Sequence, residues 1–396
     1  MNKVFIVKTN RTPFGKIGGL LAPVRPDDLL AKCLKDLTES LTFDLEKIDD
    51  IYIGCANQAG EDNRNIARMS STLAGIPFSV PATTINRLCA SSLDAVGSAY
   101  ARIKSGLADC VIAGGVESMS RAPYVLSKTG TPFGRDQKIW DSSFGWRFPN
   151  KKMEEIFPLL GMGQTAENLV EKYNISREDQ DNFALSSHLK SSKNKGFIKK
   201  TLLPVEVKLR KKSYIVDFDE CVRENSTIDS LLKLKPVFKN DGSVTAGNSS
   251  PMNDGAGTTL IVSESFLKKH NFDFAIEITG YATAGVHPDT MGIGPVESTK
   301  KAFHQTSTSV DNYDLFEMNE AFAVQVLACQ RELDIPLEKV NPIGGAISMG
   351  HPLGASGVRL IHQIFHQMKS STDIKSALAT MCVGLGQGVT ISIKSN

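Results

Sequence analysis

Short apolar runs and helical repeats of apolar residues alternate over the first part of the chain. Runs bounded by Gly, Pro or polar residues predict strands at Val4–Lys8, Ile48–Ile53, Thr83–Asn86 and Val111–Gly114. Between these runs, apolar residues at intervals of three and four predict helices over 27–37, 63–74 and 89–103. This alternation is typical of a mostly parallel sheet with helices on its faces, and it predicts the α/β class.

The alternation stops near Ser118 and returns near Glu277. The segment up to about Val244 is interrupted by Gly and Pro, which predicts an inserted, irregular and mostly helical region. Beyond it, strands are predicted near 277 and over 313–318, 377–383 and 389–393, and helices over 295–305, 320–333 and 355–368. Two turns before helices, Asn86–Cys89 and Asn341–His351, resemble each other. The chain therefore looks like two copies of one α/β unit, with a site expected where these turns face each other.

Composition excludes several classes of protein. The 45 Lys and Arg residues nearly balance 43 Asp and Glu, so the chain lacks the basic excess of a nucleic-acid-binding protein. No apolar run reaches the ~18 residues of a transmembrane helix, and Met1–Thr9 does not resemble a signal peptide. Seven cysteines without a CxxC pair predict neither a disulfide framework nor a metal site. We therefore expect a cytoplasmic protein that spans no membrane.

Cys89 lies between a predicted strand and a predicted helix. A thiol at the N-terminus of a helix faces unpaired backbone N–H groups and the positive end of the helix dipole. Both are expected to lower the pKa of the thiol and to favour the reactive thiolate. A buried cysteine is, however, more often an inert core residue. Its position alone leaves both interpretations open.

Three further residues could supply chemistry beside a thiol. His351 lies in a glycine-rich loop before a predicted helix, where it could act as a base or be an incidental turn residue. Cys382 ends an apolar strand and could exchange a proton or only fill the core. Asn319 could cap the helix that follows it or hold a water or a carbonyl oxygen. Each of these signals is weak by itself.

Together and in this order, four segments resemble the motif blocks of the thiolases: Asn86–Cys89 with Ser91, Asn319–Ala323, Gly350–Pro352 and Cys382–Gly384. The resemblance covers essentially the whole chain. It implies the thiolase fold, in which two βαβαβαββ halves form five α-β-α-β-α layers. It also implies three parts: residues 1–118 completed by about 245–272, an inserted loop domain of 119–244, and residues 273–396.

The resemblance implies a role for each reactive position. Cys89 would be the nucleophile that carries the acyl group, and His351 would activate it. Cys382 would exchange a proton with the α-carbon of acetyl-CoA. Asn319, through a bound water, and His351 would form one oxyanion hole, and the backbone N–H groups of Cys89 and Gly384 would form the second. Covalent capture on a thiol gives ping-pong kinetics.

The resemblance also implies coenzyme A as a substrate and no permanently bound cofactor or metal. The positions that match CoA contacts are Arg223, Ser230, Leu234, Ala246, Ser250, Met162 and Phe322. A homo-oligomer, either a dimer or a tetramer, is expected because the family usually forms one, and neither nucleic acid nor a membrane is an expected partner. Ser92, Pro251 and Leu385 depart from the family pattern, and they bear on substrate scope and CoA affinity.

Four segments look closest to the β-ketoadipyl-CoA (3-oxoadipyl-CoA) thiolases: Cys55–Asn65, Glu117–Pro123, Phe144–Phe148 and Met291–Pro295. This resemblance predicts cleavage of 3-oxoadipyl-CoA with CoA to succinyl-CoA and acetyl-CoA. A buried distal carboxylate would need a cation beside it, and Arg64, Arg121 and Arg147 are candidates.

Other activities stay open at this point. Acetyl-CoA C-acetyltransferases (acetoacetyl-CoA thiolases) and broad 3-ketoacyl-CoA thiolases share the reactive residues. Gly161 stands where the short-chain acetoacetyl-CoA thiolases usually carry His, and this difference disfavours a short-chain enzyme. A decarboxylating condensing enzyme of the β-ketoacyl synthase type is disfavoured by Cys382. A non-catalytic acyl-CoA-binding relative is disfavoured because all four reactive positions are filled.

Overall fold

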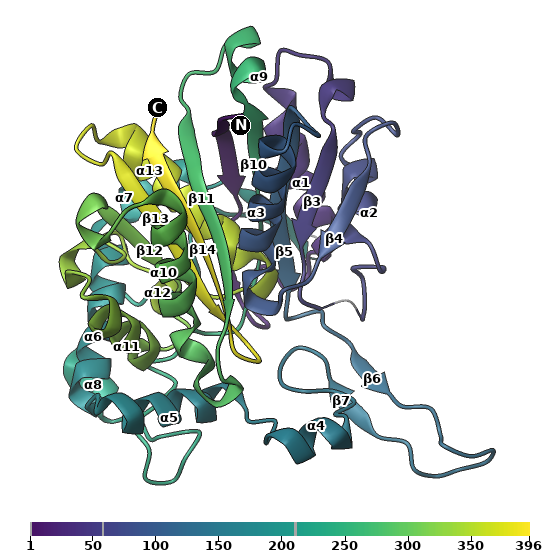
Figure 1. The fold of residues 1–396 in the computed structure, drawn as a ribbon. Coiled ribbons are helices and arrows are strands. Elements are labelled where there is room, and N and C mark those ends of the chain that lie inside the picture. Colours follow the sequence, from purple (N-terminus) through teal and green to yellow (C-terminus); the bar gives the residue numbers. More distant parts are fainter. Residues whose placement is uncertain (1, 58, 210–211) are drawn as a thin grey trace.

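The computed structural model describes residues 2–57, 59–209 and 212–396. Its main sheet takes strands from both parts of the predicted duplication (Figure 1). The first half contributes β1 (Val4–Arg11), β2 (Gly15–Lys16), β3 (Asp50–Gly54), β4 (Ala82–Ile85), β5 (Cys110–Ser118) and β10 (Asn253–Ser263). The second half contributes β11 (Ile276–Gly285), β12 (Leu315–Met318), β13 (Ser376–Val383) and β14 (Gln387–Ser395).

The two halves of the sheet repeat one arrangement. The first half has the order β1-β10-β5-β3-β4, with β2 beside β10, and the second has the order β11-β14-β13-β12. β3 is parallel to β4 and β5, and β12 is parallel to β13. The halves join where Val4–Ile6 of β1 pairs with Ile276–Ile278 of β11 in antiparallel register. The predicted duplication is therefore visible in the strand order itself.

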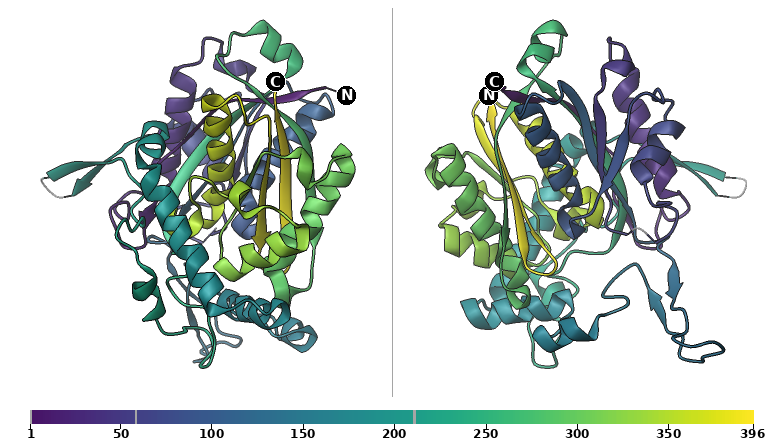
Figure 2. Two further views of the ribbon diagram at one scale, coloured as in Figure 1. Left: turned by 90° about the vertical axis from the view of Figure 1, so that its left-hand side faces the viewer. Right: turned by 45° about the vertical axis from the view of Figure 1, so that its right-hand side comes forward.

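Helices form three layers around and between the halves of the sheet (Figure 2). The outer layers are α1 (Pro26–Glu39) with α2 (Ile66–Leu73) on the first half, and α10 (Gly294–Thr306) with α11 (Ala323–Leu333) on the second. Between the halves lie α3 (Ser91–Lys104) and α13 (Ser356–Ser370), whose apolar side chains share one core with both parts of the sheet. The expected five layers are confirmed.

The short helices connect these layers. They are η1 (Leu45–Lys47), η2 (Leu88–Ala90), α9 (Glu264–Lys269), η3 (Pro288–Ile293), η4 (Val310–Asn312), η5 (Leu337–Lys339), α12 (Ala346–Met349) and η6 (Leu353–Ala355). Both α3 and α13 begin directly after such a turn, η2 and η6 respectively, and the two turns pack against each other. The two equivalent turns thus face each other, as the sequence predicted.

One strand of the expected pattern is not formed in the second half. Within the described residues 273–396, Val340 makes only an isolated parallel bridge to Phe316 where the first half has β4. The next residue, Asn341, has a left-handed backbone with φ of 45°, which ends an extended run. Its side-chain amide instead bonds both backbone groups of Met318, at 2.9 and 2.8 Å.

The inserted region contains helices, as predicted, and also two pairs of antiparallel strands, which the sequence pattern did not predict. Its elements are β6 (Tyr124–Leu126), β7 (Ile139–Asp141), α4 (Lys151–Ile156), α5 (Met162–Tyr173), α6 (Arg177–Lys193), α7 (Lys195–Thr201), β8 (Val205–Leu209), β9 (Lys212–Val216) and α8 (Ile228–Leu232). The β6–β7 hairpin projects away from the body of the molecule (Figure 1). In the part of the chain that is described, no helix is long and apolar enough to cross a membrane.

The fully buried strand β10 was also not predicted. It pairs with β1 on one side and with β5 on the other, in the middle of the first half of the sheet. Its glycines interrupt the apolar pattern, but each stands where another group comes close. A Cβ on Gly255 would lie 2.3 Å from the ring of Phe14, and one on Gly257 would lie 2.9 Å from the carbonyl oxygen of Asn10.

The contact of β3 with α3 leads to a test of the fold. A Cβ on Gly54 would lie 2.3 Å from the backbone of Ser91 and Ser92 at the start of α3. Because backbone cannot move aside as a flexible side chain can, we expect Gly54→Ala to lower the free energy of unfolding by about 1–3 kcal/mol. Urea unfolding followed by circular dichroism measures this change.

The matched control is Gly196→Ala in α7, where an added Cβ meets nothing within 4 Å. Because alanine favours a helix over glycine, this variant should be as stable as the parent chain or up to about 1 kcal/mol more stable. Equal unfolding curves for Gly54→Ala and Gly196→Ala would contradict the close contact between β3 and α3.

Candidate active site

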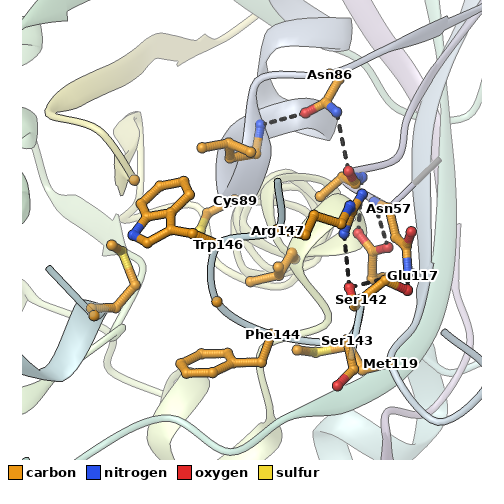
Figure 3. A pocket seen from close by; sticks show the side chains of 17 residues that line it. Asn57, Asn86, Cys89, Glu117, Met119, Ser142, Ser143, Phe144, Trp146 and Arg147 are labelled. Carbon is orange, nitrogen blue, oxygen red and sulfur yellow. Dashed lines mark hydrogen bonds between the residues drawn. The ribbon is translucent and has the colours of Figure 1, made fainter. Parts of the chain in front are cut away.

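A cavity of about 260 Å³ lies where the ends of β3 and β5 meet the turn before α3 (Figure 3). All three parts of the chain line it: Asn57, Cys89 and Glu117 from the first half, Trp146, Arg147 and Met162 from the inserted region, and Leu353 and Gly384 from the second half. Cys89, Gly384 and Met162, predicted from distant parts of the sequence, therefore share one wall.

The turn that carries Cys89 is held by its own side chains. Leu88 has a left-handed backbone with φ of 45°, and its N–H donates to Oδ1 of Asn86 at 2.9 Å. Ser91 donates from Oγ to the carbonyl of Leu88 at 2.6 Å and accepts the N–H of Arg87 at 3.0 Å. These bonds place Cys89 in η2, the short helix that directly precedes α3.

The pKa of Cys89 differs from the sequence prediction. Burial raises the pKa of this thiol to about 11, although the backbone N–H groups of Gly384 and of Cys89 itself lower it. The start of the helix thus acts in the predicted direction, but desolvation outweighs it. At neutral pH Cys89 is therefore a protonated thiol, and a reaction through its sulfur would need a base.

His351 and Asn319 are both buried and contact each other. Nδ2 of Asn319 lies 3.4 Å from Nδ1 and 3.5 Å from Nε2 of His351. Oδ1 of Asn319 accepts Nη2 of the fully buried Arg359 at 3.0 Å, which turns the amide NH₂ of Asn319 toward the imidazole. Arg359 therefore fixes the orientation of Asn319.

Burial and hydrogen bonds also fix the state of His351. Burial first, and then the charge of Arg359, lower the pKa of His351 to about 3, so its ring is neutral at pH 7. Nδ1 lies 2.6 Å from Oγ of Ser356, whose hydroxyl donates to the carbonyl of Pro352 at 2.8 Å. With its proton used in this way, Ser356 accepts from Nδ1–H, and Nε2 carries the lone pair, which has Nδ2 of Asn319 3.5 Å away. A neutral imidazole with that tautomer can take the proton of a thiol.

Cys382 ends β13 and is almost fully buried. Burial, followed by the neighbouring Cys89, raises the pKa of Cys382 well above its usual value. Two of the glycines that follow it are explained by backbone conformation and packing. Gly386 has φ of 77°, and a Cβ on Gly388 would lie 2.0 Å from the carbonyl oxygen of Gly294. Gly384 is the glycine of this turn that lines the Cys89 cavity.

Comparisons with known proteins identify the family of the chain. The family description "Thiolase, N-terminal domain" matches residues 4–265, and "Thiolase, C-terminal domain" matches residues 273–395.

The chain belongs to the thiolase family.

Curated relatives and solved structures extend this result over the full length. The chain is 49% identical to a β-ketoadipyl-CoA thiolase of Pseudomonas knackmussii, over 99% of both chains. It is 46% identical to the 3-oxoadipyl-CoA/3-oxo-5,6-dehydrosuberyl-CoA thiolase of Escherichia coli, over 100% of both. The crystal structure of the Bacillus anthracis acetyl-CoA acetyltransferase matches with a TM-score of 0.93 at 36% identity, over 100% of this chain and 99% of that one. Human mitochondrial 3-ketoacyl-CoA thiolase matches with 0.92 at 39%, with the same coverage.

In this thiolase, three of the predicted CoA positions share a second hollow. Arg223, Ser230 and Leu234 line a surface depression of about 430 Å³. Arg223 and Ser230 are exposed there. This hollow and the Cys89 cavity have no lining residue in common.

The other predicted CoA positions follow a neighbouring loop. Ala246 is exposed, and the N–H of Ser250 donates to the carbonyl of Ala321 at 3.0 Å. Phe322 is buried beside it and forms a bridge to Ser249. The structure thus brings these positions next to the segment that carries Asn319.

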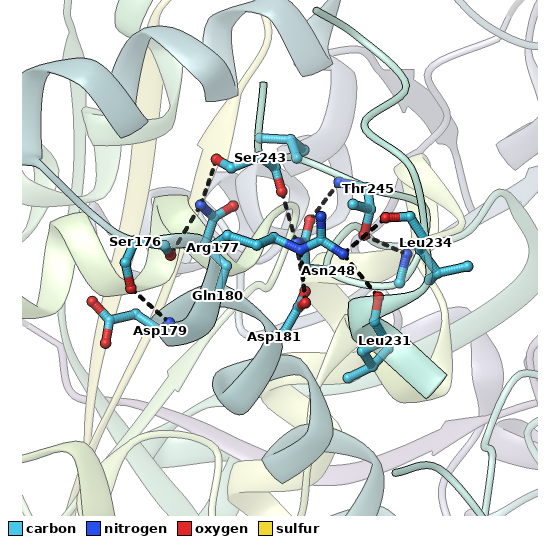
Figure 4. A network of polar contacts seen from close by, with 12 residues as sticks. Ser176, Arg177, Asp179, Gln180, Asp181, Leu231, Leu234, Ser243, Thr245 and Asn248 are labelled. Atoms are coloured by element: carbon cyan, nitrogen blue, oxygen red, sulfur yellow. Dashed lines mark hydrogen bonds and ion pairs between the residues drawn. The ribbon is translucent and has the colours of Figure 1, made fainter. Parts of the chain in front are cut away.

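A polar network holds the loop and the hollow together (Figure 4). Arg177 of α6 pairs with Asp181 at 2.7 Å and donates to the carbonyls of Leu231 and Leu234 at 2.8 and 3.0 Å. Asp181 in turn accepts Nδ2 of Asn248 at 2.9 Å. The Arg177–Asp181 ion pair on α6 therefore fixes the end of α8 relative to the loop that carries Ala246.

Two of the three departures from the family pattern have a structural account. Oγ of Ser92 accepts the N–H of Val358 at 3.0 Å and so joins the starts of α3 and α13. Leu385 takes a left-handed backbone with φ of 63° in the turn between β13 and β14. Nothing in the structure explains Pro251.

Sequence reasoning missed three residues that hold the site together. Glu117 accepts backbone N–H groups of Ala56, Asn57 and Gly354, at 3.0, 3.1 and 2.8 Å. Asn253 accepts the N–H of His351 at 3.0 Å, and Arg359 orients Asn319 as described above. The available signal was a charged residue in an apolar context: Glu117 ends a buried strand, and Arg359 lies on the apolar face of a helix.

The state of the thiol leads to a test of the site. Because burial raises the pKa of Cys89 to about 11, the thiolate fraction should keep growing as the pH rises from 7 to 10. We expect the rate of alkylation of Cys89 by iodoacetamide to rise about tenfold per pH unit over this range. Mass spectrometry of the peptide that contains Cys89 measures the rate, and Cys89→Ser shows the background from other cysteines.

A preformed thiolate–imidazolium pair would behave differently. Its alkylation rate would reach a plateau between about pH 6 and 8, because the thiol would already be ionised there. Such a plateau would contradict the neutral state of Cys89 and His351.

Proposed function

We propose that this thiolase cleaves 3-oxoadipyl-CoA with free CoA to succinyl-CoA and acetyl-CoA, through an acyl group on Cys89. The observation that carries the proposal is the position of Cys89. Its thiol lines the cavity beside the backbone N–H of Gly384, and it raises the pKa of the neighbouring Cys382. The neutral His351 stands two residues before Leu353 of the same lining and contacts Asn319. Covalent transfer of an acyl group needs this set of a thiol, a base and oxyanion donors.

The first half-reaction breaks the bond between C2 and C3 of the substrate. His351 takes the proton of Cys89, and the sulfur attacks the C3 carbonyl carbon. The electron pair of the broken bond leaves as the enolate of acetyl-CoA, and Cys382 gives it a proton. In the second half-reaction the Cys382 thiolate takes the proton of the CoA thiol, and the CoA sulfur attacks the acyl-Cys89 thioester. The bond between the acyl group and Cys89 breaks, succinyl-CoA is released, and the Cys89 thiolate takes its proton back from His351.

Two sets of donors would stabilise the two oxyanions. His351, with a water held by Asn319, would bind the oxygen of the acetyl-CoA enolate. The backbone N–H groups of Cys89 and Gly384 would bind the oxygen of the tetrahedral intermediate, and these two groups already act on the Cys89 sulfur. The CoA moiety would extend over Met162 and Phe322 toward the hollow of Arg223, Ser230 and Leu234, past Ala246 and Ser250.

Similarity and cavity size support the choice of substrate. The two relatives named above are β-ketoadipyl-CoA and 3-oxoadipyl-CoA/3-oxo-5,6-dehydrosuberyl-CoA thiolases, at 49% and 46% identity. The cavity of about 260 Å³ is smaller than the ~300–1,000 Å³ of a typical drug-sized pocket, so it suits a short acyl chain.

Thiolysis assays with purified protein test the proposal. We expect kcat/KM for 3-oxoadipyl-CoA to exceed kcat/KM for acetoacetyl-CoA by at least tenfold, with ping-pong kinetics toward CoA. Cys89→Ala should lose thiolysis of both substrates by at least 10³-fold, because the acyl group has no acceptor. A preference for acetoacetyl-CoA would contradict the choice of substrate, and near-normal turnover by Cys89→Ala would contradict the mechanism.

We also propose that the protein works as a homo-oligomer in the cytoplasm, built from the three parts 1–118 with 245–272, 119–244 and 273–396. The β6–β7 hairpin, residues 124–141, supports the assembly. It extends away from the body (Figure 2), and its apolar side chains Tyr124, Leu126, Phe133 and Ile139 are all more than 60% exposed. A cluster of this kind on a soluble surface is typical of a contact with another protein chain.

Light scattering tests this assembly. Leu126→Ser combined with Phe133→Ser should lower the molar mass of the particle, because the apolar contact between copies is weakened. Leu107→Ser, which changes an equally exposed leucine at the end of α3, is the control and should keep the mass of the parent protein. An unchanged mass for the hairpin variant would contradict a contact made through residues 124–141.

A further inference from the structure

The three arginines that the sequence offered for a distal carboxylate lie in different surroundings. Arg121 forms a two-point ion pair with Glu61, at 2.5 and 2.6 Å, and lines a small cavity of about 20 Å³ that adjoins the Cys89 cavity at Asn57 and Glu117. Arg64 is exposed and lines neither cavity. Arg147 alone of the three lines the cavity that contains Cys89.

The guanidinium of Arg147 is available to a ligand. It is half-buried, and its Nη1 donates to the carbonyl of Ser142 at 3.0 Å. In the described parts of the chain no carboxylate lies within 4 Å of it. Its charge reaches as far as the buried Asp62, whose pKa is nevertheless raised because desolvation is the larger effect. Arg147 is thus held by one carbonyl and interacts with Asp62 only at longer range, whereas Arg121 is in direct contact with Glu61.

The loop that carries Arg147 divides the cavity into an apolar and a polar side. In Figure 3, Trp146 and Arg147 extend to opposite sides of the cavity. Nε1 of Trp146 donates to the carbonyl of Leu160 at 2.9 Å, which fixes its ring near Gly384 and Met162. On the side of Arg147, Nδ2 of Asn57 donates to Oγ of Ser142 at 3.2 Å.

One negative group stands in the same wall and limits where an anion could bind. Glu117 is almost fully buried, and both of its oxygens accept backbone N–H groups, from Ala56, Asn57 and Gly354. Burial raises the pKa of Glu117 to about 7. A second carboxylate in this cavity therefore needs a cation of its own, and Arg147 is the cation that the lining supplies.

We propose that Arg147 binds the distal carboxylate of a dicarboxylic 3-oxoacyl-CoA and so selects this substrate class over 3-oxoacyl chains that end in a methyl group. The inference rests on the proposed function, because it assumes that the acyl chain on Cys89 fills this cavity. The planar guanidinium can meet a carboxylate with two parallel hydrogen bonds, which a lysine cannot do.

The test compares two substrates of equal length. 3-Oxoadipyl-CoA and 3-oxohexanoyl-CoA differ only in a terminal carboxylate against a methyl group. For Arg147→Gln, which removes the charge but keeps a polar side chain, we expect kcat/KM for 3-oxoadipyl-CoA to fall about 10- to 100-fold. The loss of kcat/KM for 3-oxohexanoyl-CoA should be at least tenfold smaller, so the variant should lose most of the preference for 3-oxoadipyl-CoA. Arg147→Lys should keep part of the preference, as a point charge without the two-point geometry.

Arg121→Gln is the matched control, because Arg121 carries the same charge outside the Cys89 cavity. It should retain the substrate ratio of the parent enzyme. Thermal unfolding of each variant shows whether it is folded, and Arg147→Lys carries the test if Arg147→Gln is not. If both Arg147 variants keep the parent ratio of kcat/KM for 3-oxoadipyl-CoA to kcat/KM for 3-oxohexanoyl-CoA, the role of Arg147 is overturned.

Failure of the proposed function would look different. It would show in the parent enzyme, as poor cleavage of 3-oxoadipyl-CoA beside acetoacetyl-CoA, before any variant is made. A parent enzyme that prefers 3-oxoadipyl-CoA, with Arg147 variants that share its preference, would leave the function in place and reject Arg147 alone.

Discussion

The backbone of three segments meets around the carboxylate of Glu117, and the position of the Cys89 cavity depends on this contact. Glu117 joins the end of β3, through Ala56 and Asn57, to Gly354 in the turn after His351. Gly354 can lie this close to β5 only because it has no side chain: a Cβ on Gly354 would lie 2.5 Å from the carbonyl oxygen of Val116. The turns of the two halves are therefore held where backbone N–H groups converge on one buried carboxylate, which gives the site a rigid frame.

Burial of this frame sets the protonation of the reactive groups. Desolvation raises the pKa of Cys89 and lowers that of His351, so both are neutral before substrate binds. A charged pair at this depth would have to be stabilised permanently, whereas neutral groups need stabilisation only while charge develops. The charge that is present nearby, on Arg359, is used to orient Asn319. The reactive groups are thus positioned by dipoles and hydrogen bonds, and the nearby charge of Glu117 adds to the rise in the pKa of Cys89.

The sequence was sufficient for the elements whose apolar pattern is regular and local. It predicted the helix before Gly106 and the strand that ends at Cys382, and the four motif segments predicted the family. It could not predict β10, because Gly255 and Gly257 make room for neighbours that are distant in sequence. It gave the wrong direction for the pKa of Cys89, because helix position can be read locally but burial cannot. Glu117 was missed for the same reason: its partners come from two other segments.

The duplication explains why the reactive residues lie so far apart in the sequence. Asn57 follows β3 and Asn319 follows β12, at equivalent places in the two copies, yet the first lines the cavity and the second contacts His351. The equivalent helix starts carry Cys89 in one copy and the His351 turn in the other, and they pack against each other. Equivalent backbones therefore supply different chemistry to one site. The first half supplies Cys89, and the second supplies His351, Asn319 and Cys382. Because each half holds only part of these candidate residues, neither half of the chain could perform the proposed acyl transfer alone.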